Sequence, residues 1–199
     1  MREHEKNKGR YGLVALLPVW SGMIIAAASA AVLLWHGRGD DGIRAVLRLT
    51  AHTSASLFCA SFAASSLVAF TKAPLMRALL RARRQVGLSF AVSHTIHLGA
   101  IISRVATSEF RSDPLTIVTG FVAYTFIALM SATSNDRAVR ALGAPAWKRL
   151  HWTGSWFLWG VFAFTYAQAT VTGDPVAAAG WTLLLATAAL RYAARRRRA

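Results

Sequence analysis

Residues 11–35 read YGLVALLPVWSGMIIAAASAAVLLW and contain no charged side chain. A transmembrane α-helix needs about 20 consecutive apolar residues to cross a hydrocarbon core roughly 30 Å thick. The stretch reaches that length, and it continues past the small residues at 26–31 that resemble a signal-peptide cleavage site. We therefore predict that it is retained as the first of several transmembrane helices.

Five further apolar runs follow at intervals that leave no space for a soluble domain. Their approximate boundaries are 46–70, 86–106, 115–133, 150–171 and 176–193. Each run has about the length that a helix needs to span a bilayer. The sequence therefore predicts an all-α, polytopic membrane protein. We expect a six-transmembrane-helix bundle that forms a single membrane domain over residues 1–199, in the plasma or inner membrane of the cell.

The composition excludes several other classes of protein. Apolar residue types make up 55% of the chain and charged types only 16%, whereas a soluble domain carries about 25% charged residues. The chain is also too hydrophobic for an intrinsically disordered protein. Its net charge is +15, but a nucleic-acid-binding protein would present such charge as a water-facing stripe. We expect the lipid bilayer, and no nucleic acid, as its partner.

The basic residues gather in alternate segments between the predicted helices. Most of the 23 Lys and Arg lie in residues 1–10, 72–84, 137–149 and 191–198. The other connecting segments hold only Arg38, Arg44, Arg48, Arg104 and Arg111. Because Lys and Arg are enriched in cytoplasmic segments of membrane proteins, we predict that both termini are cytoplasmic. Residues 1–10 and 194–199 are then basic cytoplasmic tails, and 72–84 and 137–149 are cytoplasmic loops.

Two breaks between runs have the composition of helix starts. Asp113-Pro114 and Asp174-Pro175 each place a carboxylate just before a proline. An aspartate at the N-cap accepts hydrogen bonds from the first turn, and proline suits the first helical position. We predict that helices begin at both places.

Two histidines on one helix face are the main candidates for a functional site. His94 and His97 are three residues apart, so they lie on nearly the same face of their helix. Arg104 follows His97 by seven residues on that face. Imidazoles inside a helix bundle suit haem-iron ligation, proton relay or plain hydrogen bonding between helices. Haem also needs a cation for each propionate.

Further polar residues lie on other predicted helices. Residues Arg44, Arg48, His52 and Ser56 follow each other at four-residue spacing, which places them along one row of a helix. Arg48 and Arg104 are therefore candidate propionate partners. His52 and His151 join His94 and His97 as candidate haem ligands, with His151 close to the basic segment 137–149.

Motifs for other chemistry are absent from the sequence. It contains no C-x-x-C, no G-x-G-x-x-G after a strand and no P-loop, so we expect no flavin or NAD(P)H site in this chain. The predicted helices also lack paired carboxylates and matching helix breaks of the kind that transporters use. A small transporter or channel is therefore the third choice among functions.

Two motifs resemble a known family. The stretch RRQVGL at 83–88, followed by His97, resembles the entry to the third helix of the ferric reductase-like transmembrane domain. The stretch from Thr133-Ser134 through Trp147 to His151 resembles the signature that precedes that family's fifth helix. This fold is the six-helix haem b core of NADPH oxidases, metalloreductases and the membrane subunit of the methionine sulfoxide reductase system. The resemblance covers about two-thirds of the chain.

The resemblance implies particular haem ligands. His97 matches the ligand position of the third helix, and His151 matches the first histidine of the fifth. Family members place a second histidine about 13 residues later, where this chain has Phe164. His97 and His151 should differ in depth by about 15 Å, which is too much for one haem. The candidate arrangements are therefore His97 with His52, or a five-coordinate or shifted haem that involves His94.

These observations favour two functions. The leading one is a haem b protein that passes electrons across the membrane as part of an oxidoreductase system. Its electrons would come from a cytoplasmic reductase or a quinol, so a quinone is a possible second ligand. The alternative, which Phe164 favours, is a cofactor-free membrane scaffold or interaction subunit that has kept the fold and lost a ligand.

Overall fold

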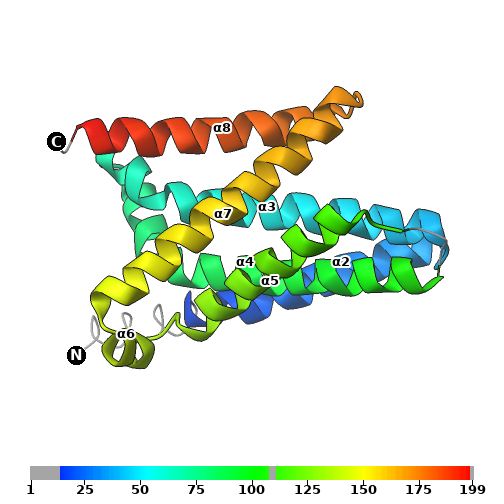
Figure 1. Cartoon of the computed structure of the whole chain (residues 1–199), viewed down its shortest axis with the longest axis horizontal. Coiled ribbons are helices and arrows are strands. Elements are labelled where there is room, and N and C mark those ends of the chain that lie inside the picture. The colour runs from blue at the N-terminus through cyan, green and yellow to red at the C-terminus, as the bar shows by residue number, and fades with distance from the viewer. Residues whose placement is uncertain (1–13, 108–110, 198–199) are drawn as a thin grey trace. The chain divides into compact units, whose positions relative to one another are not determined.

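The computed structural model describes residues 14–107 and 111–197, and every regular element in these ranges is a helix (Figure 1). The predicted tail 1–10, the start of the first predicted helix and the last two residues lie outside this range. The all-α prediction is confirmed. The helices longer than one turn are α2 (Leu17–His36), α3 (Asp40–Phe70), α4 (Pro74–Thr107), α5 (Pro114–Ala132), α6 (Asp136–Leu142), α7 (Ala144–Val171) and α8 (Pro175–Arg196).

Five of the described helices, α2, α3, α4, α5 and α8, are long and apolar enough to cross a membrane. Several large apolar side chains on them are exposed, for example Phe121 at 75% and Ile24 at 66%. Contiguous exposed apolar surface is rare on soluble monomers and is typical of surfaces that contact lipid. The chain is a multi-pass membrane protein.

Helix α7 contains the predicted run 150–171 but is not one of these five. It is long enough to span, with 28 residues. Its Trp, Tyr, Ser, Thr and Gln side chains lower its mean hydropathy, because polar atoms and ring nitrogens are costly in hydrocarbon.

Several helices extend beyond the apolar runs. The sequence predicts a loop at 72–84, yet α4 begins at Pro74. The other predicted loop, 137–149, is mostly helical as well, because α6 and the first residues of α7 lie in it. The physical reason is that Leu, Met, Ala and Arg are all strong helix formers. An apolar run marks the part of a helix in hydrocarbon and not the end of the helix.

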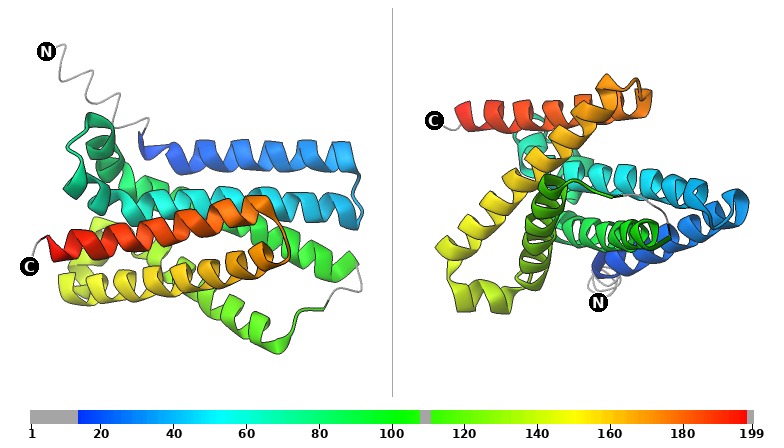
Figure 2. Two further views of the ribbon diagram at one scale, coloured as in Figure 1. Left: turned by 90° about the horizontal axis from the view of Figure 1, so that it is seen from above. Right: turned by 45° about the vertical axis from the view of Figure 1, so that its right-hand side comes forward.

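The chain divides into two compact units. The first unit comprises Met1–Ser61 with Ala78–Phe110, and the second comprises Phe62–Arg77 with Arg111–Ala199. In the first unit, α3 and α4 run antiparallel (Figure 2). The hydroxyls of Ser54 and Ser93 are 2.8 Å apart where they meet. Next to them, the rings of Phe58 and Phe90 pack at 5.5 Å between centroids.

The second unit is organised around α7, which contacts α5, α6 and α8. At Gly180 on α8, the ring of Tyr166 on α7 fills the space that a β-carbon would need. The indole N–H of Trp159 donates to the backbone carbonyl of Leu184 at 3.0 Å. Leu184 itself is fully buried. Small and aromatic residues therefore fix the α7–α8 pair.

The predicted helix starts at the two Asp-Pro pairs are confirmed. Asp113 caps α5, and Asp174 caps α8 by accepting from the backbone N–H groups of Val176 and Ala177. Prolines follow both caps, where their missing N–H removes no helical hydrogen bond.

The Asp113 cap predicts a pH dependence of stability. Hydrogen bonds from the hydroxyl and then the backbone N–H of Thr116 hold the pKa of the Asp113 carboxyl below its ordinary 3.8. A depressed pKa stabilises the fold above the unfolded-state pKa, and this contribution is lost as the pH falls through the lowered value. Asn caps helices as well as Asp but does not titrate. We therefore expect the melting temperature of Asp113→Asn to fall less on acidification than that of the wild type. An equal fall in both proteins would contradict this prediction.

Candidate functional site

His97 is held by a hydrogen bond to the neighbouring helix. Its Nδ1 lies 2.9 Å from the Oγ1 of Thr50 on α3, in the first unit. The Thr50 hydroxyl is fully buried and lies 2.7 Å from the carbonyl oxygen of Val46. A hydroxyl has a single proton, and we assign it to the bond with Val46. Thr50 therefore accepts from His97, which places the imidazole proton on Nδ1.

This tautomer determines what His97 can do chemically. A neutral imidazole with its proton on Nδ1 carries its lone pair on Nε2. Histidines that bind metals in proteins usually donate their other ring N–H to an oxygen acceptor, which fixes both the tautomer and the ring orientation. The contact between Thr50 and His97 has this form. His97 is thus oriented to offer Nε2 as a ligand.

His94 does not complete a pair of ligands with His97. The two rings are stacked, with centroids 5.1 Å apart and planes inclined by 22°. Two axial imidazoles approach one haem iron from opposite sides, each pointing a nitrogen at the metal. Rings stacked face to face on one helix do not have that arrangement. His94 also packs against Phe90, at 5.5 Å between centroids.

His52 lies on a different face of α3 from the row that contacts α4. Thr50 and Ser54 mark the contacting row, through His97 and Ser93. His52 is two residues from each of them, which is about 200° around the helix. His52 therefore points to a different side of α3 from Thr50, the residue that contacts His97.

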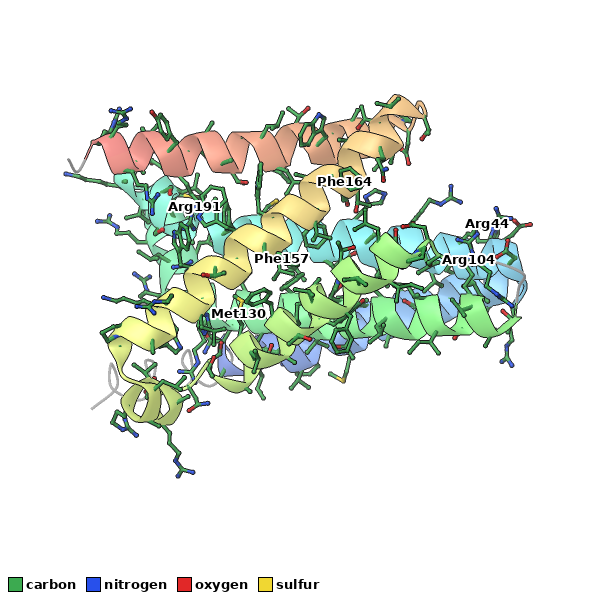
Figure 3. The ribbon with its side chains drawn as sticks, viewed as in Figure 1. Arg44, Arg104, Met130, Phe157, Phe164 and Arg191 are labelled. Atoms are coloured by element: carbon green, nitrogen blue, oxygen red, sulfur yellow. The ribbon has the colours of Figure 1, made fainter. Side chains whose placement is uncertain are left out.

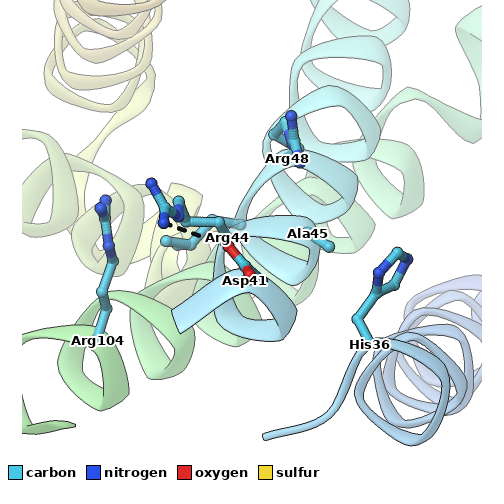
Figure 4. Close-up of a pocket in the computed structure, with 7 residues that line it drawn as sticks. His36, Asp41, Arg44, Ala45, Arg48 and Arg104 are labelled. Atoms are coloured by element: carbon cyan, nitrogen blue, oxygen red, sulfur yellow. Dashed lines mark hydrogen bonds and ion pairs between the residues drawn. The ribbon is translucent and has the colours of Figure 1, made fainter. Parts of the chain in front are cut away.

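The two predicted propionate partners, Arg48 and Arg104, line one cavity of about 680 Å³ (Figure 4). Its size is within the range of about 300–1,000 Å³ that small-molecule pockets have. Arg104 is seven residues from His97, so it lies about 10 Å further along nearly the same face of α4. The other residues that line the cavity are His36, Asp41, Arg44, Ala45 and Leu47.

Ion pairs partly neutralise the positive charge of this cavity. Arg44 contacts Asp40 at 2.7 Å and Asp41 at 3.3 Å, and the Nε of Arg104 donates to Asp40 at 3.1 Å. Arg48 is exposed and makes no ion pair within the described residues. Of the two predicted propionate partners, Arg48 is therefore available for an anion, whereas Arg104 would share it with Asp40.

His151 lies where the end of α5 meets α7 in the second unit, a contact that we call the α5–α7 corner. Its Nε2 lies 3.1 Å from the Oγ1 of Thr133, and its ring stacks on Trp147 at 4.1 Å between centroids. The indole N–H of Trp147 donates to the carbonyl of Thr133 at 2.9 Å. The Thr133 hydroxyl is 2.7 Å from the carbonyl of Leu129. We assign its proton there, so the His151 Nε2–H is the donor to Thr133, and the three signature residues join α5 to α7.

Phe164 occupies the position where the family resemblance expects a second histidine. It lies on α7 in the second unit (Figure 3), and its side chain is 62% exposed. Its neighbours Phe162, Ala163 and Tyr166 are buried. The position thus faces away from the interior of its unit.

The residues present fit one axial ligand of a haem. His97 supplies an oriented imidazole, and the cavity lined by Arg48 and Arg104 supplies cations on the same side of α4. The ring of His94 is stacked on that of His97, and His52 lies on a different face of α3 from Thr50. Among the described residues there is also no group of three or more His, Cys, Asp or Glu side chains that could hold a metal ion.

Thr50 was missed by the sequence reasoning, which followed the row from Arg44 to Ser56. The row that faces α4 is displaced from it by two residues and contains Thr50 and Ser54. A signal was present: Ser93 and His97 have the same four-residue spacing on the partner helix. Matching polar pairs of equal spacing on adjacent helices predict hydrogen bonds between them.

Comparison with known proteins finds one similar to this chain in Polaromonas naphthalenivorans (strain CJ2), described as protein-methionine-sulfoxide reductase heme-binding subunit MsrQ. The two are 29% identical over 121 residues, which are 57% of this chain and 53% of the relative. The match therefore spans about half the length of that protein. No protein-family model and no solved structure matches the chain. The chain is distantly similar to a haem-binding subunit, which agrees with the resemblance seen in its motifs.

Proposed function

We propose that this chain is the membrane haem-binding, electron-transfer subunit of a methionine sulfoxide reductase system. The observation that carries the proposal is His97, whose Nδ1 is fixed by Thr50 so that Nε2 carries the lone pair. The similarity to a haem-binding subunit supports it, as do the helices that are long and apolar enough to cross a membrane.

In this proposal His97 holds the haem iron, and Arg48 binds a propionate, with Arg104 as a second donor shared with Asp40. When bound, haem b would supply the one-electron chemistry. The chain fixes the imidazole, balances the propionate charge and surrounds the site with apolar helices. The opposite side of the haem would be occupied by His52, or the haem would be five-coordinate or shifted toward His94.

The finer topology belongs to the same proposal. We infer six membrane spans that form a single membrane domain, with α7 as the span added to the five apolar helices. Both termini would lie on the cytoplasmic side of the plasma or inner membrane. The basic segments 72–84 and 137–149 then face the side on which a reductase or a quinol would deliver electrons. Quinone is the small molecule that suits this role, and a partner subunit would carry out the reduction of the substrate.

Growth of cells tests the function. A methionine auxotroph that lacks this chain should fail to grow with methionine sulfoxide as its methionine source, and the wild-type chain should restore growth. Variant His97→Ala, produced at the same level in the membrane, should not. Growth that is independent of the chain would contradict the proposal.

A cofactor-free scaffold is the second candidate, and the exposed Phe164 is the observation that favours it. A scaffold of this kind would keep the α5–α7 corner and would need no haem. The growth experiment distinguishes the two candidates, because a scaffold with His97→Ala would restore growth as well as the wild-type chain.

We expect that removing the Thr50 hydroxyl weakens haem binding while the protein stays folded. Thr50→Val has nearly the same shape but cannot accept from His97. Loss of such an outer contact typically lowers metal affinity about 10–100-fold. Thr53→Val is the matched control, because the Thr53 hydroxyl bonds only the carbonyl of Leu49 on its own helix. Haem titration followed by absorbance measures both; equal affinities would show that Thr50 does not orient the ligand.

A further inference from the structure

A second cavity lies in the second unit, at the basic end of α8. It has a volume of about 120 Å³, and its lining residues are Ser65, Ser66, Arg191, Ala194 and Arg195. A water molecule takes up about 30 Å³ in the liquid, so the space suits a few waters or one small ion and no large cofactor. Its polar lining consists of two guanidinium groups and two hydroxyls.

Arg191 is held in place on one side of this cavity. Its Nη1 donates to the carbonyl oxygen of Phe62 at 2.8 Å. Its guanidinium carbon lies 4.1 Å from the centroid of the Phe62 ring and 5.6 Å from that of Trp156. Arginine stacked on aromatic rings keeps its plane fixed and its positive charge in place. Arg195 is one helical turn further on, and its guanidinium lies 6.0 Å from the ring of Trp152.

Ser65 and Ser66 differ from most hydroxyl residues in these helices. Hydroxyls such as those of Ser29 and Thr170 donate to the carbonyl four residues earlier. The side-chain hydroxyls of Ser65 and Ser66 make no hydrogen bond within the described residues. A carbonyl oxygen has two lone pairs.

The carbonyl oxygens that these two serines would normally use already have partners. Phe62 O accepts from Arg191, and Ser61 O accepts from the Nε of Arg83 at 2.9 Å. Each carbonyl also accepts the helical N–H four residues later, which fills both lone pairs. The hydroxyl protons of Ser65 and Ser66 are therefore left for an acceptor in the cavity that these serines line.

A cavity with hydroxyl and guanidinium donors and no acidic residue in its described lining is suited to an anion. We propose that it binds the phosphate group of an anionic membrane phospholipid. The lipid is favoured over free phosphate because the cavity lies where a candidate membrane span ends in Arg195 and Arg196. Basic residues and tryptophan gather at the level of lipid headgroups. This site is separate from His97 and does not depend on the proposed haem.

Lipid titration of the purified full chain tests the site. The probes are short-chain phosphatidylglycerol, short-chain phosphatidylcholine and inorganic phosphate. We expect phosphatidylglycerol to bind the wild type more tightly than either of the others. Arg195→Gln and the double variant Ser65→Ala, Ser66→Ala should each weaken binding about tenfold or more, since hydrogen bonds to a charged group are lost.

The matched control is Arg196→Gln. Arg196 is adjacent in the same helical turn and carries the same charge, but it donates to the hydroxyl of Tyr192 and does not line the cavity. It should keep nearly wild-type affinity. Equal weakening by Arg195→Gln and Arg196→Gln would overturn the site, because it would indicate general attraction to basic residues. Binding of inorganic phosphate as tight as that of phosphatidylglycerol would overturn the lipid as its ligand. Melting curves of each variant exclude unfolding as the cause.

Discussion

Replacing His97 by Ala should remove bound haem from the purified protein. In the proposed function its Nε2 binds the haem iron, and the hydrogen bond between Nδ1 and Thr50 orients the ring. Without an axial imidazole, haem would be held only by apolar contacts and propionate pairing, so we expect the Soret absorbance per protein to fall to near zero. Absorption spectra of the variant and the wild type, purified in the same detergent, measure the change.

His94→Ala is the control for this variant, because it removes a histidine from the same helix and nearly the same face. His94 stacks on His97 and Phe90 and is not placed opposite His97. We expect it to keep the Soret band, with a shift in position at most. A variant without His97 that retains full haem, or a loss of haem only with His94→Ala, would assign the ligand to another residue.

Gly180→Ala should destabilise the protein by about 1–3 kcal/mol in the free energy of unfolding, the usual cost of overpacking a core. The Tyr166 ring of α7 occupies the position of the added β-carbon. Tyr166 is buried, so its ring has little space to move away. Unfolding of the purified chain in mixed micelles, followed by circular dichroism, gives the free energy.

Gly160→Ala, on α7 of the same helix pair, should change the free energy of unfolding in the opposite direction. Nothing lies within 4 Å of a β-carbon at position 160 on α7. Alanine is favoured over glycine in a helix interior by about 1 kcal/mol, so this variant should be more stable than the wild type. If both variants changed stability in the same direction, the packing of α7 on α8 described above would be wrong.

The helices and their starts could be predicted from the sequence because their signals are local. Asp113 and Asp174 mark helix starts through the chemistry of a single turn, and apolar runs mark the parts of helices that lie in hydrocarbon. The start of α4 at Pro74 could not be found in this way. Its first turns are basic, and they are helical because of backbone propensity and not because of hydropathy.

The candidate site was predictable only in part, because helical periodicity groups residues into rows but does not say which row faces a neighbour. The row with Arg48 and His52 and the row with Thr50 and Ser54 are equally regular in the sequence. The choice between them depends on how α3 rotates against α4, which is set by packing over the whole interface. His97 was predicted as a ligand position, whereas its partner Thr50 emerged only from the contact between the helices.

The absorption spectrum of the purified wild-type chain tests directly whether it binds haem through His97. The chain is produced with ample haem, and its spectrum is recorded before and after reduction with dithionite. We expect a Soret band that shifts on reduction and that is lost with His97→Ala. A folded, helical protein with no Soret band in either state would contradict it and would leave the cofactor-free scaffold as the function of this chain.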